Sequence, residues 1–426
     1  MTMPSRRPHS PCGDSASGPR RPGYTPLMKW ASFVSEEPDI SVATHQASQE
    51  VLEQMHGCHP DLLFVFVSPH HEEDYPVVPE EIRRFFPDSA IIGCSGGGVV
   101  GGGREVEHSP ALSITAAWLP EVRVEPFHLE PADADDLGAD PSAWYERVQI
   151  HGNDSAHFVL FPDPYSCDAA ALLRSLDVAF PDSGKIGGLA SGATRPGENA
   201  LFVGDDVYPD GAVGLILDGN IDMDTIVAQG CRPVGGPLFV TAAARNRVLE
   251  LDGRRPTEVM AEIFHELEPG DRDLFRRSLF VGVVMNEGRS EYGHGDFLIR
   301  NVVGVDPETG TLTVGEVLRP GQVIQFHVRD ALTSAADLES ALDAYKVESP
   351  GEVSGILLFS CLGRGETLYG EPDHDCRAIA GHLGPTPIGG FFCNGEIGPV
   401  DQRTFLHGYT SSIGVFRPRH TIEPDD

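Results

Sequence analysis

The sequence lacks features that mark several classes of protein. No apolar run approaches the roughly 20 residues that a helix needs to cross a bilayer, so we expect no membrane insertion. Basic residues are scarce, because 31 Lys and Arg stand against 64 Asp and Glu, a formal net charge of −33. Nucleic acid is therefore an unexpected partner, since phosphate binding depends on a basic surface. The eight cysteines include no CxxC pair, which favours reduced thiols in a cytoplasmic protein.

Length and turn-forming residues set the scale of the fold. At 426 residues the chain is long enough for two to three domains, and 48 Gly with 35 Pro indicate many turns and short strands. Residues 1–27 are rich in Pro, Arg, Ser and Gly, a composition that cannot bury enough apolar surface to order itself. We predict a disordered N-terminal extension there, with Met28 as the true start, and a short tail over residues 419–426.

One arrangement of strand, helical segment and glycine-rich turn occurs three times. The glycine-rich segments lie within residues 87–119, 181–217 and 385–416. Each follows a short apolar run typical of a strand buried on both faces, at residues 62–67, 157–161 and 355–360. Such repetition predicts a duplicated architecture. We therefore expect an α/β protein with mixed β-sheets built from repeated strand-helix-strand units, helices packed on the sheets, and a strand-rich middle portion.

Local patterns add further expectations. Apolar spacing predicts helices over residues 39–56 and 256–267. The acidic stretch 130–140 is interpreted as a surface loop. Strands at 111–118 and 122–128 are predicted to form an antiparallel pair, because a two-residue turn separates suitable apolar runs.

The third glycine-rich turn has the composition of a ligand site. Glycine permits close backbone approach, and this turn carries a thiol, an amide and a carboxyl group, with polar side chains just downstream. Arg364 follows a buried strand, which is a usual place for ligand contacts in α/β sheets. A cation and an anion together suit an amino acid. The predicted ligand-binding residues are Arg364, Cys393, Asn394, Glu396, His407 and Tyr409, with Cys94 and Ser95 at the corresponding point of the first unit.

Each of these residues also has a structural interpretation. Arg364 and Glu396 could form a structural ion pair, and His407 with Tyr409 could be satisfied core residues. Arg300 and Arg329 follow alternating strands and are interpreted as facing water. Cys393 could act as a nucleophile with His407 as its base, but the three units do not share a reactive group, which favours a shared turn geometry. We therefore assign no catalytic residues.

Cofactor and metal sites find little support in the sequence. The glycines at 96–98 and 101–103 belong to neither a GxxxxGK[ST] loop nor a GxGxxG turn that opens a helix, so no nucleotide cofactor is expected. The acid- and histidine-rich segments at 70–74 and 373–376 are compositionally suited to a metal, but adjacent loop residues rarely converge on one ion. Asp373 is instead predicted to cap the helix that reaches Leu383.

Several segments in a fixed order resemble the FIST family, named for F-box and intracellular signal transduction proteins. They are GGFFCNGEIGPV with FLHGYTSSIGVF, GILLFSCLGRGETLYG, VAQGCRPVGGPLFVT with VLELDG, and FLIRNVVGVD with GQVIQFHVRDA. The resemblance covers roughly residues 30–417 and implies an N-terminal FIST domain over 28–240 and a C-terminal one over 241–418. It also implies a sensory role with a small ligand, amino acids among those proposed.

These predictions suggest three classes of function. The favoured one is a cytoplasmic sensory module that binds a small polar ligand and acts through a separate signalling protein, because no output segment follows Phe416. The second is a thiol-dependent hydrolase or transferase that uses Cys393 and His407. The third is an acidic scaffold that binds a basic protein.

Overall fold

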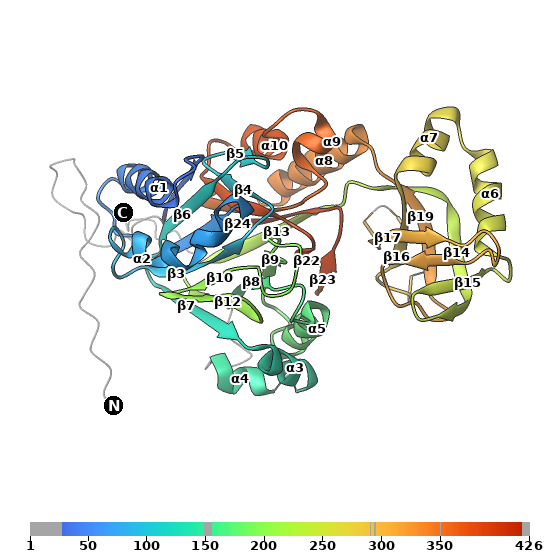
Figure 1. Cartoon of the computed structure of the whole chain (residues 1–426), viewed down its shortest axis with the longest axis horizontal. Coiled ribbons are helices and arrows are strands. Elements are labelled where there is room, and N and C mark those ends of the chain that lie inside the picture. The colour runs from blue at the N-terminus through green and yellow to red at the C-terminus, as the bar shows by residue number, and fades with distance from the viewer. Residues whose placement is uncertain are drawn as a thin grey trace, which may run out of the picture.

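Three six-stranded mixed sheets and a closed β-barrel make up the computed structural model (Figure 1). The structure describes residues 28–419, except residues 141, 149–155, 290, 294 and 350. The predicted extension over residues 1–27 and most of the predicted tail lie outside the described residues. The predicted class, a mixed α/β protein with a strand-rich middle portion, is confirmed.

The three sheets share one strand pattern when each is written from its edge strand. The first contains β1 (Lys29–Ser35), β6 (Leu112–Trp118), β2 (Leu62–Val67), β3 (Ala90–Ser95), β10 (Leu201–Val203) and β11 (Asp206–Tyr208). The second contains β7 (Val122–Leu129), β12 (Ala212–Gly219), β8 (His157–Pro162), β9 (Lys185–Gly188), β22 (Glu396–Val400) and β23 (Arg403–His407). The third contains β13 (Asp222–Ala228), β24 (Ser411–Arg417), β20 (Gly355–Cys361), β21 (Ile388–Cys393), β4 (Gly98–Gly101) and β5 (Arg104–Val106).

The units exchange hairpins among the sheets. Each unit supplies two parallel strands to its own sheet, and the following hairpin then joins another sheet: β4–β5 the third, β10–β11 the first and β22–β23 the second. The predicted repetition is therefore confirmed. The predicted antiparallel pair of 111–118 and 122–128 is wrong, because β7 leaves the first sheet and pairs with β12 in the second.

Aromatic rings from the three units meet at the centre of the fold. Phe66, Phe161 and Phe359 occupy corresponding positions on β2, β8 and β20, and all three are fully buried. The ring centroid of Phe161 lies 5.4 Å from that of Phe66 and 5.8 Å from that of Phe359. The inner faces of the sheets thus share one apolar core, which the hydrophobic effect stabilises.

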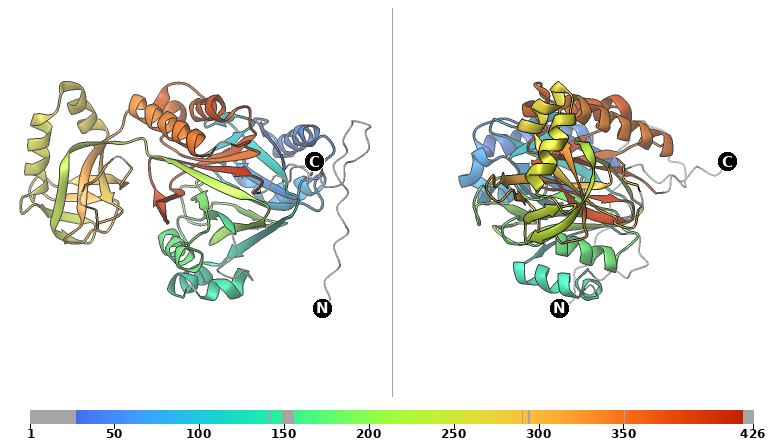
Figure 2. Two further views of the ribbon diagram at one scale, coloured as in Figure 1. Left: turned by 180° about the vertical axis from the view of Figure 1, so that it is seen from behind. Right: turned by 90° about the vertical axis from the view of Figure 1, so that its right-hand side faces the viewer.

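Helices cover the outer face of each sheet (Figures 1 and 2). On the first sheet these are α1 (Ile40–Met55), the 3-10 helix η1 (Pro69–Val77) and α2 (Val78–Arg83). On the second they are α3 (Pro131–Ala139), α4 (Ala143–Val148) and α5 (Ala169–Ala179). On the third they are α8 (Ala331–Glu348), α9 (Gly365–Tyr369) and α10 (His374–Leu383). The loop predicted at 130–140 is wrong, because Pro131 starts α3, whose Ala134 and Leu137 are buried.

The strand-rich portion closes into a barrel beside the three sheets (Figure 2). Its strands, in order, are β14 (Arg232–Ala244), β15 (Arg247–Leu251), β18 (Leu312–Val314), β17 (Phe297–Val305), β16 (Leu279–Val284) and β19 (Val323–Val328). The helices α6 (Pro256–Glu266) and α7 (Pro269–Arg277) accompany it. Residue 240, where we place the domain boundary from sequence, lies within β14. Among the helices of the described residues, none has the length and apolarity needed to span a membrane.

Candidate functional site

The candidate site lies where the parallel strands of the third unit end. β20 and β21 run side by side, and Cys361 is paired in register with Cys393 at their last residues. Glu396 opens β22 just after β21, and Thr410 precedes β24. Ligands in α/β proteins commonly bind beyond the carboxyl ends of parallel strands, because loops and backbone groups converge there.

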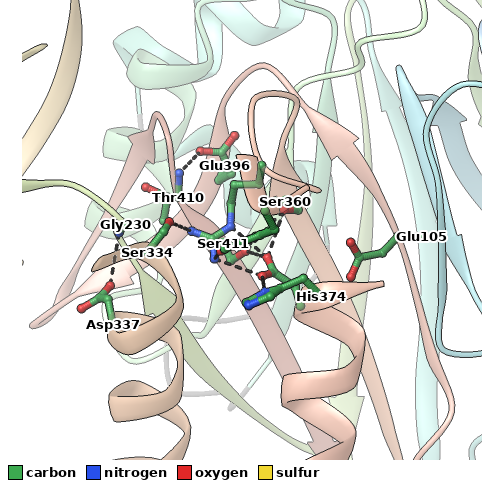
Figure 3. A network of polar contacts seen from close by, with 12 residues as sticks. Glu105, Gly230, Ser334, Asp337, Ser360, His374, Glu396, Thr410 and Ser411 are labelled. Atoms are coloured by element: carbon green, nitrogen blue, oxygen red, sulfur yellow. Dashed lines mark hydrogen bonds and ion pairs between the residues drawn. The ribbon is translucent and has the colours of Figure 1, made fainter. Parts of the chain in front are cut away.

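Glu396 is a fully buried carboxyl group at this edge. The backbone N–H of Thr410 donates to Glu396 Oε2 at 3.1 Å (Figure 3). Cys393 Sγ lies 3.6 Å from both Glu396 Oε1 and the carbonyl oxygen of Ser360, and can donate its single hydrogen to either. Burial raises the pKa of Glu396 to about 8, although the nearby Arg329 opposes part of the rise. The carboxyl group is therefore largely protonated at neutral pH.

Arg329 brings a buried cation to the same place. Its side chain follows β19 and is 7% exposed, and its Nε and Nη2 have no hydrogen-bond partner within the described part of the chain. A Cβ atom placed on Gly363 would lie 2.9 Å from Arg329 Nη1. The sequence interpretation that Arg329 faces water is wrong. β19 is buried along its whole length, so the alternation that suggested an exposed position is absent.

Tyr409 connects the site to the barrel. The guanidinium carbon of Arg329 lies 5.3 Å from the centroid of the Tyr409 ring. The hydroxyl of Tyr409 donates to Asn301 Oδ1, and its ring lies 4.3 Å from that of Phe280, both on barrel strands. Tyr409 has a φ of 65°, a left-handed conformation that costs energy in a bulky residue and often marks functional positions. Burial raises the pKa of its hydroxyl to about 12.

Arg364 has a structural partner inside the protein. Its Nε and Nη2 donate to the two oxygens of Asp375 at 2.9 and 3.1 Å, and both side chains are almost completely buried. Nη2 also donates to the Tyr369 hydroxyl. Nη1 donates to Ser334 Oγ, and Ser411 donates to Asp375; Ser334 and Ser411 are labelled in Figure 3. The attraction of Arg364 holds the pKa of Asp375 well below its usual range despite burial. Most hydrogen-bond donors of Arg364 are therefore already bonded to residues inside the protein, which leaves few for a ligand.

The proposed nucleophile and base do not contact each other. His407 Nε2 lies 3.0 Å from the carbonyl oxygen of Gly398, whereas the Cys393 thiol faces Glu396 and Ser360. Burial raises the pKa of Cys393 and lowers that of His407 to about 4. A protonated thiol without an adjacent base is a poor nucleophile.

The remaining predicted site residues lie apart from this cluster or face outward. Cys94 is packed in the central apolar core. Ser95 Oγ donates to Asn199 Oδ1 at 3.2 Å and accepts from the N–H of Ala200, so its hydroxyl is used internally. Asn394 is exposed at the turn between β21 and β22.

Sheet register also corrects the correspondence between units. Gly93 lies opposite Val65 and Gly390 opposite Leu358, and each glycine is pressed against the backbone of its neighbour. Counted from these glycines, Cys94 corresponds to Phe391, two residues before Cys393. The sequence interpretation that paired Cys94 with the third turn's cysteine is therefore wrong.

The predicted metal-like segments and the cysteines have structural positions in the described residues. No group of three His, Cys, Asp or Glu side chains is arranged there to hold a metal ion. Asp373 occupies the N-cap position of α10 as predicted, but its Oδ1 accepts from the backbone of Glu105 rather than from its own helix. Six of the described cysteines are free thiols.

Replacing Glu396 by glutamine should flatten the dependence of stability on pH. The folded protein keeps the Glu396 proton up to about pH 8, whereas the unfolded chain releases it near its ordinary pKa. Its contribution to the free energy of unfolding is thus complete below about pH 4.5 and is lost as pH rises to about 8. Urea unfolding of both proteins across this range measures the difference. Glu105, whose pKa burial also raises to about 8, is common to both, and parallel curves would contradict the assignment.

Two sequence models of known domains match adjacent parts of the chain. The sequence model of the FIST N domain matches residues 61–254, and that of the FIST C domain matches residues 256–399. An uncharacterized protein of Mycobacterium tuberculosis is 36% identical over 391 residues, which cover 91% of this chain and 100% of that protein. An uncharacterized protein of Mycobacterium bovis is 34% identical over 392 residues, covering 91% and 99%.

Two more distant similarities complete the comparison. An F-box/LRR-repeat protein of Arabidopsis thaliana is 23% identical over 362 residues, covering 71% of this chain and 66% of that protein. Cyanuric acid hydrolase from A. caulinodans matches with a TM-score of 0.37 and 8% identity, over 93% of this chain and 100% of its own. A structural likeness that distant has no bearing on function.

Proposed function

Because the chain belongs to the FIST family, whose domains are sensory domains of signal transduction, we propose that it is a cytoplasmic sensor of a small carboxylate-bearing ligand, such as an amino acid. The ligand would bind at the strand ends of the third unit, and a separate signalling protein would read the occupied state. A ligand shifts such a protein only through its different affinity for two states.

The observation that carries this proposal is the buried guanidinium of Arg329. Its Nε and Nη2 point at no hydrogen-bond acceptor among the described residues, and the side chain is 7% exposed. A buried charge without a hydrogen-bond partner is costly, so such groups are rare unless something else satisfies them. A carboxylate suits a guanidinium fork well, because it accepts two parallel N–H bonds.

Glu396 offers the complementary group for a zwitterion. Its carboxyl is fully buried and close enough to Arg329 for the cation to lower its pKa. An ammonium group beside Glu396 would lower that pKa further, so binding would release the proton of the Glu396 carboxyl group. The affinity for an amino acid should therefore rise as pH approaches 8, whereas a simple carboxylate would not show this rise.

A thermal-shift screen of the full chain against amino acids and common metabolites tests the proposal. Ligand at 100 times its dissociation constant should stabilise the protein by about 2.7 kcal/mol. We expect at least one carboxylate-bearing compound to raise the unfolding midpoint of the wild type, and Arg329→Gln to abolish the shift.

Asn394→Ala provides the matched control for this screen. Asn394 is exposed at the turn between β21 and β22, close in sequence to Glu396, so its replacement should leave the ligand-induced thermal shift intact. The proposal fails if no compound raises the midpoint, or if Arg329→Gln responds as the wild type does.

A further inference from the structure

The barrel is attached to the three-sheet body by two short segments. One, at residues 229–231, leads from β13 to β14, and the other, at residues 329–330, leads from β19 to α8. In Figure 1 the barrel stands beside the body, joined at that side. Asp337 on α8 accepts the backbone N–H of Gly230 at 3.3 Å, so α8 holds both segments together near its start.

Both polar and apolar contacts dock the barrel on the body within the described residues. Arg300 Nη2 donates to the carbonyl oxygen of Leu406 at 3.2 Å, and Arg289 pairs with Asp401 at 2.8 Å on the surface. Tyr409 contacts Asn301 and Phe280, as described above, and packs in an apolar cluster with Phe297 and Ile299 of the barrel. The side chain of Gln229, in the first connecting segment, donates to the carbonyl oxygen of Phe297. Exposed ion pairs contribute little to stability, so we expect the packing of Tyr409 against Phe280 to contribute more to docking than the Arg289–Asp401 pair.

The candidate site draws its groups from both sides of this junction. Arg329 lies on the barrel's exit segment, whereas Glu396 and Tyr409 belong to the three-sheet body. With the barrel docked, Glu396 is fully buried and Arg329 nearly so. A ligand therefore reaches Glu396 only after part of the surrounding structure moves, and Arg329 lies on a segment that joins the barrel to the body. Nε and Nη2 of Arg329 have no hydrogen-bond acceptor in the described structure, and a bound carboxylate would supply one.

From this geometry we infer that the barrel is a lid over the Arg329–Glu396 site, which opens about residues 229–231 and 329–330 and is held closed by an occupant. This inference rests on the proposed function and adds its regulation. Occupancy and closure favour each other by the same free energy, because linkage is reciprocal. The position of the barrel is then the property that an output partner can read.

Thiol alkylation of the full-length protein measures opening without any ligand. Cys361 lies at the junction and Cys94 in the central core, and both are buried, so Cys94 reports global unfolding only. We expect Phe280→Ala to speed alkylation of Cys361 relative to Cys94 by about tenfold, which corresponds to about 1.4 kcal/mol of docking free energy. Phe239→Ala, which truncates a barrel ring that is 57% exposed, is the matched control and should change neither rate.

A second measurement tests the coupling to occupancy. A mixture of the proteinogenic amino acids should slow backbone hydrogen exchange in β23, which contacts the barrel, in the wild type but not in Arg329→Gln. Equal alkylation of Cys361 and Cys94 in every variant would overturn the lid. If an Arg329-dependent thermal shift is found while β23 exchange stays unchanged, the lid fails and the sensor stands. If no compound shifts the midpoint, the sensor and its coupling fail together, and the Phe280 comparison alone decides whether the barrel opens.

Discussion

Replacing Asp375 by alanine should lower the free energy of unfolding by about 3–5 kcal/mol, because it leaves the guanidinium of Arg364 buried and without its counter-charge. Both side chains are almost completely excluded from solvent, and their two hydrogen bonds are within 3.1 Å. Ser411 would also lose the acceptor of its 2.7 Å hydrogen bond, which adds to the cost. Denaturant unfolding at neutral pH measures the loss.

Glu371→Ala is the matched control for this prediction. Glu371 pairs with Arg377 at 2.9 Å, but both side chains are more than half exposed. Exposed pairs contribute about 0–1 kcal/mol, so the control should change stability little. If Asp375→Ala costs no more than Glu371→Ala, the buried pair is not a structural element of the third unit.

Gly390→Ala should prevent folding or cost more than about 4 kcal/mol. A Cβ atom at this position would lie 1.9 Å from the carbonyl oxygen of Leu358 on the neighbouring parallel strand, and the φ of Gly390 is 146°, where side chains are disfavoured. Gly187 meets Leu160 at the same distance and φ in the second unit, and alanine there should have the same effect. Expression level and unfolding midpoint report the outcome.

Gly381→Ala tests whether the effect of Gly390→Ala is steric. Gly381 lies within α10, and nothing lies within 4 Å of a Cβ atom placed there. Alanine should stabilise this helix by about 0.5–1 kcal/mol, since glycine has the greater unfolded-state entropy. If Gly390→Ala folds with a stability like that of the control, the close approach of β20 and β21 is wrong.

Sequence patterns predicted the repeated units because each strand is signalled locally. The runs at residues 62–67, 157–161 and 355–360 are apolar throughout, and the structure places each on a strand buried on both faces. The helix predicted at 39–56 matches α1, since its apolar spacing has the helical period.

The exchange of hairpins could not be predicted from the same information. A short turn between two strands favours local pairing, yet β6 and β7 part at Leu119 because their partners lie in different sheets. Which strand β6 or β7 pairs with depends on contacts with strands far away in the sequence, and the residues between β6 and β7 do not encode these contacts. Closure of the barrel is likewise a property of six strands together.

Three residues of the candidate site lie where local sequence features predict a glycine-rich turn. Glu396, Cys393 and Tyr409 gather near the third turn because a glycine-rich loop follows a buried strand, and the sequence shows both features. Arg329 was misplaced because its burial depends on the barrel that docks beside it. The only local indication is the unbroken apolar character of the strand before it, residues 323–328.

The most direct test of the account is a crystal structure of the protein with the panel compound that gives the largest Arg329-dependent thermal shift. We expect the carboxylate of that compound against Nε and Nη2 of Arg329, with Glu396 at its other end and the barrel docked on Tyr409. A compound bound elsewhere, with the guanidinium of Arg329 still unengaged, would contradict it.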